Sequence, residues 1–339
     1  MSFLSNFHHI TRRALNLSLC SIALTVSPAL VQSSVAAEAI EQWPSRDIHL
    51  IVPFGAGSTP DQVARIVAAE ASKTLGQTIV IDNKAGAGGN IGTAAIARAK
   101  PDGYTFGISI NGPLVYNQFI FNELGYHPET DLAPLTLAVT QPNVIVANNS
   151  LNITTLEELV NAIKNNPDKY NFAIPGTGSG SHLSMELLLK AIGGQATAIP
   201  YPSSPAAINS LLAGDTQFTA LAPIAVVPLA QDGRLKILAQ TSDKPNSTLP
   251  DVPTVSSTGV AEIDSQAWSG FVISSKVPEA IRSKLQKALF DALHNPQVVE
   301  LIKAQYMDPI PSTPESFTAY MLEEKKRWQP LIESLDLKK

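Results

Sequence analysis

The chain of 339 residues has little cysteine, few aromatic side chains and no long apolar runs. Its one cysteine, Cys20, lies in an N-terminal apolar stretch, so the rest of the chain has no disulfide, free thiol or thiolate metal site. Only 6% of the residues are aromatic, which disfavours a carbohydrate site built on stacked rings. No segment has the roughly 18 consecutive apolar residues that a membrane span needs.

Basic side chains are not in excess either. The formal charge is −5, and it becomes −7 without the first 37 residues, which carry Arg12 and Arg13 and no acid. This balance argues against a nucleic-acid partner. The chain is 44% apolar and, at this length, exceeds one ordinary domain, so we expect two lobes.

Residues 1–37 have the pattern of a secretory signal. Two arginines precede a mostly apolar stretch, and Val35-Ala36-Ala37 is a typical small-residue cleavage site. We therefore expect export to the periplasm and a mature chain that starts near Glu38. The general secretory and twin-arginine routes both stay open. Leu19 precedes Cys20 where a lipid attachment site needs a small residue, which argues against a lipoprotein.

Strands and helices alternate along most of the remaining chain. Short apolar runs predict strands, and the following periodic stretches predict helices, as in a parallel sheet. A capping box at Thr155 and Glu158 opens one helix, which we expect to reach about Asn165. Three helices are expected to close the chain. The expected strands are 48–54, 79–81, 104–110, 144–147, 172–174, 199–201, 218–221, 237–240 and 268–273, and the closing helices are 278–293, 296–305 and 313–328.

Three glycine-rich segments each join a strand to a helix. We call residues 52–61 the first glycine loop, residues 83–92 the second and residues 175–182 the third. At such a junction the glycines allow close approach of a ligand, and unpaired N–H groups and the helix dipole favour an anion. Two of these junctions close together indicate a carboxylate held by the backbone.

Other uses of these loops fit less well. The first two loops lack the third glycine of a dinucleotide fingerprint, and no Gly-Lys-Ser/Thr occurs. Ser179 and Ser181 are more typical of helix caps than of nucleophiles, and Gly-x-Ser-x-Gly is absent. His182 fits ligand contact and a partly buried position equally well. The other histidines of the mature chain are too scattered to predict a metal site.

Polar residues of the first glycine loop divide into two groups. Asp61 fits best as a first-turn acid that complements the dipole of its helix. Thr59 is expected to be the N-cap, with Pro60 in the first turn. Ser58 and Thr59 also carry hydroxyls beside exposed amides, so we favour ligand contact for these two.

At these residues the chain resembles the Bug family, the periplasmic solute receptors of tripartite tricarboxylate transporters. The resemblance runs in order through nearly the whole mature chain, which makes it specific. The matching segments are Val52-Pro53-Phe54 with Gly55 to Gly57, Asp61 and Ala64-Arg65; Leu75-Gly76-Gln77; Gly86-Ala87-Gly88-Gly89 with Gly92; Pro101-Asp102-Gly103-Tyr104-Thr105; Gly176-Thr177-Gly178-Ser179 with His182; Leu249 to Thr254; and Trp268-Ser269-Gly270.

The resemblance implies an α/β, two-lobed periplasmic-binding-protein fold (type II), each lobe a mixed, mostly parallel sheet flanked by helices. Lobe 1 would comprise residues 38–140 and 262–339, and lobe 2 residues 141–261. The ligand would lie between the lobes, with its proximal carboxylate on the first two loops and the third loop closing over it. The implied contacts are Phe54, Gly57, Ser58, Thr59, Gly86, Ala87 and Gly88 in lobe 1, and Thr177, Gly178, Ser179 and His182 in lobe 2.

Three departures from the family pattern stand out. Ala85 replaces the usual proline, and Ser274-Ser275-Lys276 replaces an apolar-Ala-Pro turn. Many relatives place an acid where this chain has Leu221, and an acid there would pair with a ligand ammonium. Leu221 cannot, so we expect a ligand without an amino group and with an apolar or aromatic distal end.

The leading hypothesis is therefore a receptor, not an enzyme, that binds a small carboxylate and delivers it to the membrane subunits of a tripartite transporter. We expect a monomer without cofactor, metal or nucleic acid. Two alternatives stay open: a periplasmic sensor that feeds a signalling kinase, and a hydrolase that uses His182 with Ser179 or Ser181.

Overall fold

The computed structural model describes residues 42–167 and 169–337. The signal peptide expected over residues 1–37 lies outside the described residues. In the part that is described, no helix combines the length and the apolar character that crossing a membrane requires.

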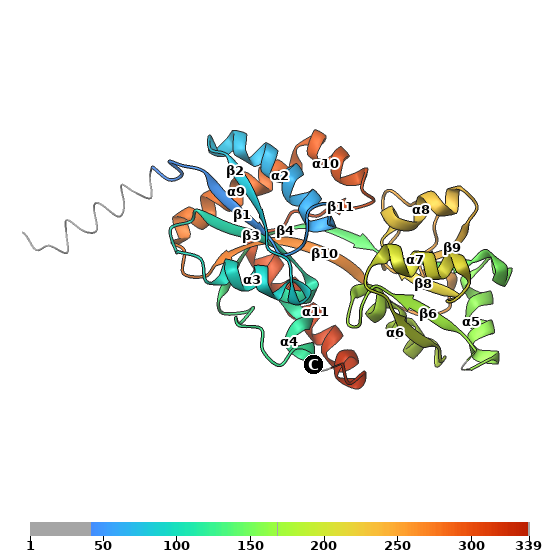
Figure 1. The fold of residues 1–339 in the computed structure, drawn as a ribbon. Helices are drawn as coiled ribbons and strands as arrows, with labels where there is room; N and C mark the ends of the chain where they lie inside the picture. The colour runs from blue at the N-terminus through green and yellow to red at the C-terminus, as the bar shows by residue number, and fades with distance from the viewer. Residues whose placement is uncertain (1–41, 168, 338–339) are drawn as a thin grey trace, which may run out of the picture. The chain divides into compact units, whose positions relative to one another are not determined.

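Strands and helices alternate through these residues (Figure 1). In chain order they are β1 (Ile48–Val52), α2 (Thr59–Leu75), β2 (Ile79–Asn83), η1 (Ala87–Gly89), α3 (Asn90–Ala97), β3 (Thr105–Ile110), η2 (Gly112–Tyr116), α4 (Asn117–Ile120), β4 (Leu132–Pro142), β5 (Val144–Asn148), η3 (Asn149–Leu151), α5 (Leu156–Asn165), β6 (Asn171–Ile174), α6 (Gly180–Ile192), β7 (Thr197–Pro200), α7 (Ser204–Ala213), β8 (Phe218–Leu221), α8 (Pro223–Gln231), β9 (Leu235–Gln240), η4 (Ser256–Thr258), β10 (Gln266–Ser274), α9 (Glu279–His294), α10 (Pro296–Lys303), β11 (Asp308–Pro309) and α11 (Pro314–Ser334).

The strands form two sheets, with the orders β11-β4-β10-β3-β1-β2 and β7-β6-β8-β5-β9. Both are mixed, as expected. Parallel pairs are not the majority, however: among the described strands, four of the nine pairs are parallel. The reason is that β4 and β10 insert antiparallel to their neighbours in the first sheet, and β5 does the same in the second.

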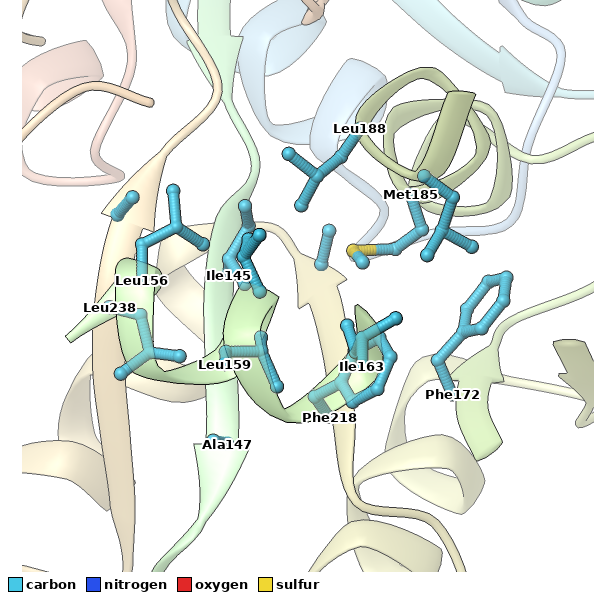
Figure 2. Packing of buried hydrophobic residues seen from close by; sticks show 14 of the residues in the cluster. Ile145, Ala147, Leu156, Leu159, Ile163, Phe172, Met185, Leu188, Phe218 and Leu238 are labelled. Carbon is cyan, nitrogen blue, oxygen red and sulfur yellow. The ribbon is translucent and has the colours of Figure 1, made fainter. Parts of the chain in front are cut away.

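Helices cover both faces of each sheet. Along β5, Ile145 and Ala147 face one apolar cluster and Val144 and Val146 the other, as the alternation of a strand requires. Figure 2 shows the first cluster, where Leu156, Leu159 and Ile163 of α5 pack beside Ile145. In the first sheet, α2 packs with α9, and α3 and α11 share a second cluster with strand residues of β1 and β10.

Over residues 42–167 and 169–337 the chain passes between the sheets twice. We call residues 142–144, between β4 and β5, the first crossing and residues 264–266, at the start of β10, the second crossing. Thr241 is fully buried and bonds both: its N–H donates to Asn143 O (2.9 Å) and its carbonyl accepts from Ser265 N–H (2.8 Å). Its hydroxyl donates to Ser265 O (2.5 Å) and accepts from Asn143 N–H (3.0 Å).

Most expected elements are present, with ends that differ by a few residues. The capping box is confirmed, because Thr155 accepts from Glu158 N–H and Glu158 reaches back to Thr155 N–H. Thr59 as N-cap is wrong: α2 begins at Thr59 and the N-cap is Ser58, since Pro60 is tolerated one position further into the first turn. Strand β4, helices α4 and α8 and the turn η2 were not predicted. The division at residues 140 and 262 stays our proposal for the lobes.

Candidate functional site

The first glycine loop carries a serine hydroxyl without a partner. Ser58 is the N-cap of α2, with extended backbone angles (φ −68°, ψ 159°), but its side chain does not cap the helix. Its Oγ is buried and has no hydrogen-bond partner among the described residues. Since buried hydroxyls are usually satisfied, this one is available to a ligand.

Asp61 fastens this loop to its surroundings. The side chain is 2% exposed and accepts from Gly57 N–H (2.8 Å), Arg65 Nε (3.0 Å) and Asn83 Nδ2 (2.9 Å). Burial alone would raise the pKa of Asp61, but the hydrogen bonds from Arg65, Asn83 and Gly57 N–H hold it below its ordinary value. Three of the roughly four acceptor sites of the carboxylate are thus taken by the protein itself. Its interpretation as a structural acid rather than a ligand contact fits these bonds.

The second glycine loop lies against the first. Four consecutive residues have positive φ: Gly86 (136°), Ala87 (47°), Gly88 (63°) and Gly89 (94°). A Cβ on Gly89 would lie 2.9 Å from Phe54 Cζ and 2.8 Å from Pro113 Cγ, so only glycine allows this contact. Asn83 also donates to Phe54 O (2.9 Å). The structure therefore brings the two predicted carboxylate loops together.

The third glycine loop is held by its own helix. Ser179 is the N-cap of α6, and its hydroxyl accepts from His182 N–H (3.2 Å), which confirms its interpretation as a cap. His182 is 4% exposed; Nδ1 accepts from Gly178 N–H (3.1 Å) and Nε2 lies 3.4 Å from Glu186 Oε1. Within the described residues the ring thus accepts a hydrogen bond from the loop and lies near an acid, and it bonds no serine hydroxyl. This geometry does not supply the serine and histidine pair that the hydrolase alternative needs.

The second and third loops both approach the segment around α4. A Cβ on Gly88 would lie 3.5 Å from Phe121 Cζ, and one on Gly178 would lie 3.0 Å from Ile120 Cδ1. Gly178, expected in lobe 2, therefore lies next to Ile120, a residue expected in lobe 1. Ligand contact by Gly86, Ala87, Gly88, Thr177, Gly178, Ser179 and His182 stays a prediction.

A pocket of about 250 Å³ opens at the first glycine loop. It includes three of the predicted contacts, Phe54, Ser58 and Thr59, and it contains no charged side chain. The lining residues are Phe54, Ser58, Thr59, Pro60, Ile110, Asn111, Val139, Gln141, Ala222, Ala267, Trp268, Ser269 and Met307.

Three adjacent strands supply the pocket floor, which we define as Ile110, Ser269 and Val139. Ser269 on β10 pairs with Ile110 on β3 and with Val139 on β4, so the three lie in one row across the sheet. Paired residues on adjacent strands face the same side, which brings these side chains to one surface. They were not predicted as site residues. The one available signal was Asn111, a polar residue at the carboxyl end of β3, the edge of a sheet where ligands bind.

Leu221 does not line the pocket, although the next residue in the chain does. It is 1% exposed and packs in an apolar cluster with Val144, Val226 and Leu235. The next residue, Ala222, lines the pocket. Contact between Leu221 and a ligand stays a prediction, but the described wall at this point is small and uncharged.

Comparison with known proteins gives a consistent result. The model of the tripartite tricarboxylate transporter family receptor matches residues 63–337. The chain is 31% identical to protein BugT of Bordetella pertussis over 315 residues, covering 93% of this chain and 96% of BugT. A structure of an R. palustris protein with adipate aligns with a TM-score of 0.77 at 30% identity, covering 85% of this chain and 97% of that one. MatC of Rhodopseudomonas palustris with bound malate aligns with a TM-score of 0.73 at 29% identity, covering 86% and 100%.

The match extends over most of this chain and of each relative, and the two solved structures share its fold at about 30% identity. The expected resemblance to Bug receptors and the expected two-lobed α/β fold are thereby confirmed. This chain belongs to the tripartite tricarboxylate transporter receptor family.

Proposed function

We propose that this chain is a periplasmic receptor that binds a small carboxylate without an amino group in the pocket at the first glycine loop, and delivers it to the membrane subunits of a tripartite transporter. The observation that carries this proposal is a pocket at the N-terminus of α2 that is lined, among the described residues, by no charged side chain and by Ser58, whose buried hydroxyl has no partner there.

Such a wall suits an anion. Helix α2 has 17 residues, and the N–H groups and dipole at its start favour negative charge by about 0.3–1 kcal/mol, and up to about 2 kcal/mol where partly buried. Ser58 adds one hydroxyl donor. A carboxylate is held here by dipoles, without a formal counter-ion.

The same wall disfavours an ammonium group. The lining residues include no Asp or Glu, and a buried charge without a partner is costly. Apolar side chains of Ile110, Val139, Trp268 and Met307 line much of the pocket, beside the polar but uncharged Asn111, Gln141 and Ser269. A hydrocarbon or aromatic distal end therefore fits better than a second charged group.

Two similar structures hold adipate and malate, which are both carboxylates. They lend support to the same ligand class for this chain. Because the family consists of receptors, we propose binding without turnover here as well.

Thermal unfolding of the mature protein with matched acids tests the ligand class. The pairs are adipate with 2-aminoadipate and malate with aspartate, since each pair differs at one substituent, and benzoate is added for an aromatic end. A ligand at 100 times its Kd adds about 2.7 kcal/mol of stability, a rise in Tm of about 4 °C for about 300 residues. We expect the acids without an amino group to raise Tm more. A larger rise with the amino-bearing partners would refute the ligand class.

Delivery is tested separately. Cells that lack this receptor are expected to lose uptake of the bound acid, and added mature receptor to restore it in spheroplasts. Binding without any loss of uptake would refute the transport step and leave the signalling alternative.

A further inference from the structure

One buried carboxylate behind the pocket takes no part in the proposed function. Glu324 on α11 is 2% exposed. Its Oε2 accepts from Trp268 Nε1 (3.0 Å), Trp328 Nε1 (3.1 Å) and the Tyr116 hydroxyl (3.3 Å). Its Oε1 lies 3.2 Å from Arg327 Nη1. Three donors and one cation thus converge on a single side chain.

Two branches of this network end at the pocket. Trp268 lines the pocket itself, and its indole N–H is bonded to Glu324. Asn111 also lines the pocket, and its Nδ2 donates to the Tyr116 hydroxyl (3.1 Å), which donates to Glu324. Because the Tyr116 proton points to the carboxylate, the phenol oxygen is free to accept from Asn111. The carboxylate therefore helps to orient the Asn111 amide, together with Gly112 N–H, which donates to Asn111 Oδ1 (3.1 Å).

A third branch reaches the second crossing. Arg327 Nη1 donates to Asp264 Oδ2 (2.7 Å) and to Asp264 O (3.1 Å), and Asn111 Nδ2 donates to Gln266 O (3.3 Å). Glu324 thus connects α11 to a pocket wall and to a segment that joins the two sheets.

The donors around Glu324 suit the ionised form. An indole N–H can only donate, and Arg327 carries a fixed positive charge. Burial raises the pKa of the Glu324 carboxyl above its ordinary value, although the hydrogen bonds from Trp268 and Trp328 and the charge of Arg327 oppose this. The other titratable groups that face this network are Tyr116, Tyr320, Arg327 and Asp264.

We propose that Glu324 is a positioning residue for ligand binding: its carboxylate orients the Trp268 indole and, through Tyr116, the Asn111 amide, so ligand affinity depends on a charge that does not touch the ligand. The affinity part rests on the proposed function, whereas the orientation part does not.

The first arm of the test needs no ligand. The three indole N–H signals of the 15N-labelled mature protein are assigned by single Trp→Phe variants. In Glu324→Gln, the Trp268 and Trp328 signals are expected to shift, while that of Trp43, whose Nε1 has no partner among the described residues, stays in place. Glu323→Gln is the matched control, because Glu323 is the neighbouring, exposed acid and pairs with exposed Lys326. An unmoved Trp268 signal in Glu324→Gln would overturn the orientation part.

The second arm uses benzoate as the probe, because its distal end is uncharged. Glu324→Gln is expected to weaken binding between about 2-fold and 30-fold, the range seen for coupled residues without ligand contact. Tyr116→Phe removes only the hydroxyl, so it is expected to weaken binding while leaving the Trp268 signal nearly unchanged. Glu323→Gln should stay within twofold of wild type.

The pH dependence separates positioning from mere stability. Since the ionised form positions the wall, the affinity ratio of wild type to Glu324→Gln should be largest at neutral pH. This ratio should approach one as the pH falls through the raised pKa of Glu324. Protonation of the probe affects both proteins equally, so it does not change the ratio. Measuring the same pH dependence in Asp264→Asn shows whether the Asp264 carboxyl, which also bonds Arg327, causes it instead. An affinity ratio near one at neutral pH would overturn the proposal. If wild type binds no acid of the thermal panel, the proposed function is refuted, and the indole N–H signals alone decide whether Glu324 orients Trp268.

Discussion

Replacing Ser58 with alanine distinguishes two roles of its hydroxyl, that of a helix cap and that of a ligand contact. An N-cap serine normally stabilises its helix, and its loss costs about 0.5–2 kcal/mol. The Ser58 hydroxyl bonds no backbone N–H of α2 and is buried without a described partner. Its removal should therefore change the free energy of unfolding by less than about 0.5 kcal/mol, and relieving an unsatisfied group even favours the variant.

Ligand binding should respond in the opposite way. A hydrogen bond to a charged group is worth about 1.5–3 kcal/mol, so Ser58→Ala is expected to weaken binding of the best acid from the thermal panel by about 10-fold to 150-fold. Calorimetric titration measures this loss, and urea unfolding measures stability.

Thr155→Ala is the matched control for this prediction. Thr155 is the N-cap of α5 and does bond its helix, accepting from Glu158 N–H (3.2 Å). Its replacement should cost about 0.5–2 kcal/mol of stability and leave binding unchanged. If Ser58→Ala lost as much stability as Thr155→Ala and kept its affinity, the hydroxyl would be an ordinary cap and the reasoning would be wrong.

Two further predictions concern the loops that carry the pocket. Asp61→Asn should lower the free energy of unfolding at neutral pH. Because the pKa of Asp61 is depressed in the folded protein, the difference in this free energy from wild type should be full above about pH 5 and should shrink below about pH 4. Urea unfolding at several pH values measures it. Gly89→Ala should lower the free energy of unfolding by about 1–3 kcal/mol, since φ is +94° and the new Cβ would clash with Phe54. Gly55→Ala is the control: a Cβ there would meet open space, so the same free energy should change by less than about 0.5 kcal/mol. Equal unfolding midpoints for the two glycine variants would contradict the assigned contact.

Local chemistry made much of the fold predictable. Thr155 and Glu158 specify a helix start by themselves, and β-branched runs ending in glycine marked β1 and β2. Strand β4 was missed because Pro134, Thr136 and Gln141 interrupt its apolar sequence. Pro134 is tolerated because β4 pairs there with β10 alone, since β11 reaches only Val139 and Thr140. Polar positions of β4 are bonded, as where Thr136 accepts from Ser312 N–H (3.0 Å).

The site was predictable only where it is local. The glycine-rich sequence of the first glycine loop predicts unpaired N–H donors at the start of the next helix. Ser58 and Thr59 were predicted as ligand contacts because they lie beside those donors. The pocket floor did not, because Ile110, Val139 and Ser269 meet through strand pairing across more than 100 residues of sequence, which no short pattern records. Glu324 was missed for the same reason, since its partners Tyr116 and Trp268 lie on other elements.

Thr241 has a consequence for how this receptor moves. One residue bonds both crossings through backbone and hydroxyl, so a change in the backbone of either crossing alters the hydrogen bonds of the other. Rotation of one sheet against the other is then a single coupled motion rather than two independent ones. If the two crossings move together, the protein has fewer conformations that cannot bind the ligand. The fraction of molecules able to bind is then larger, so the measured affinity lies closer to the affinity of the binding-competent conformation.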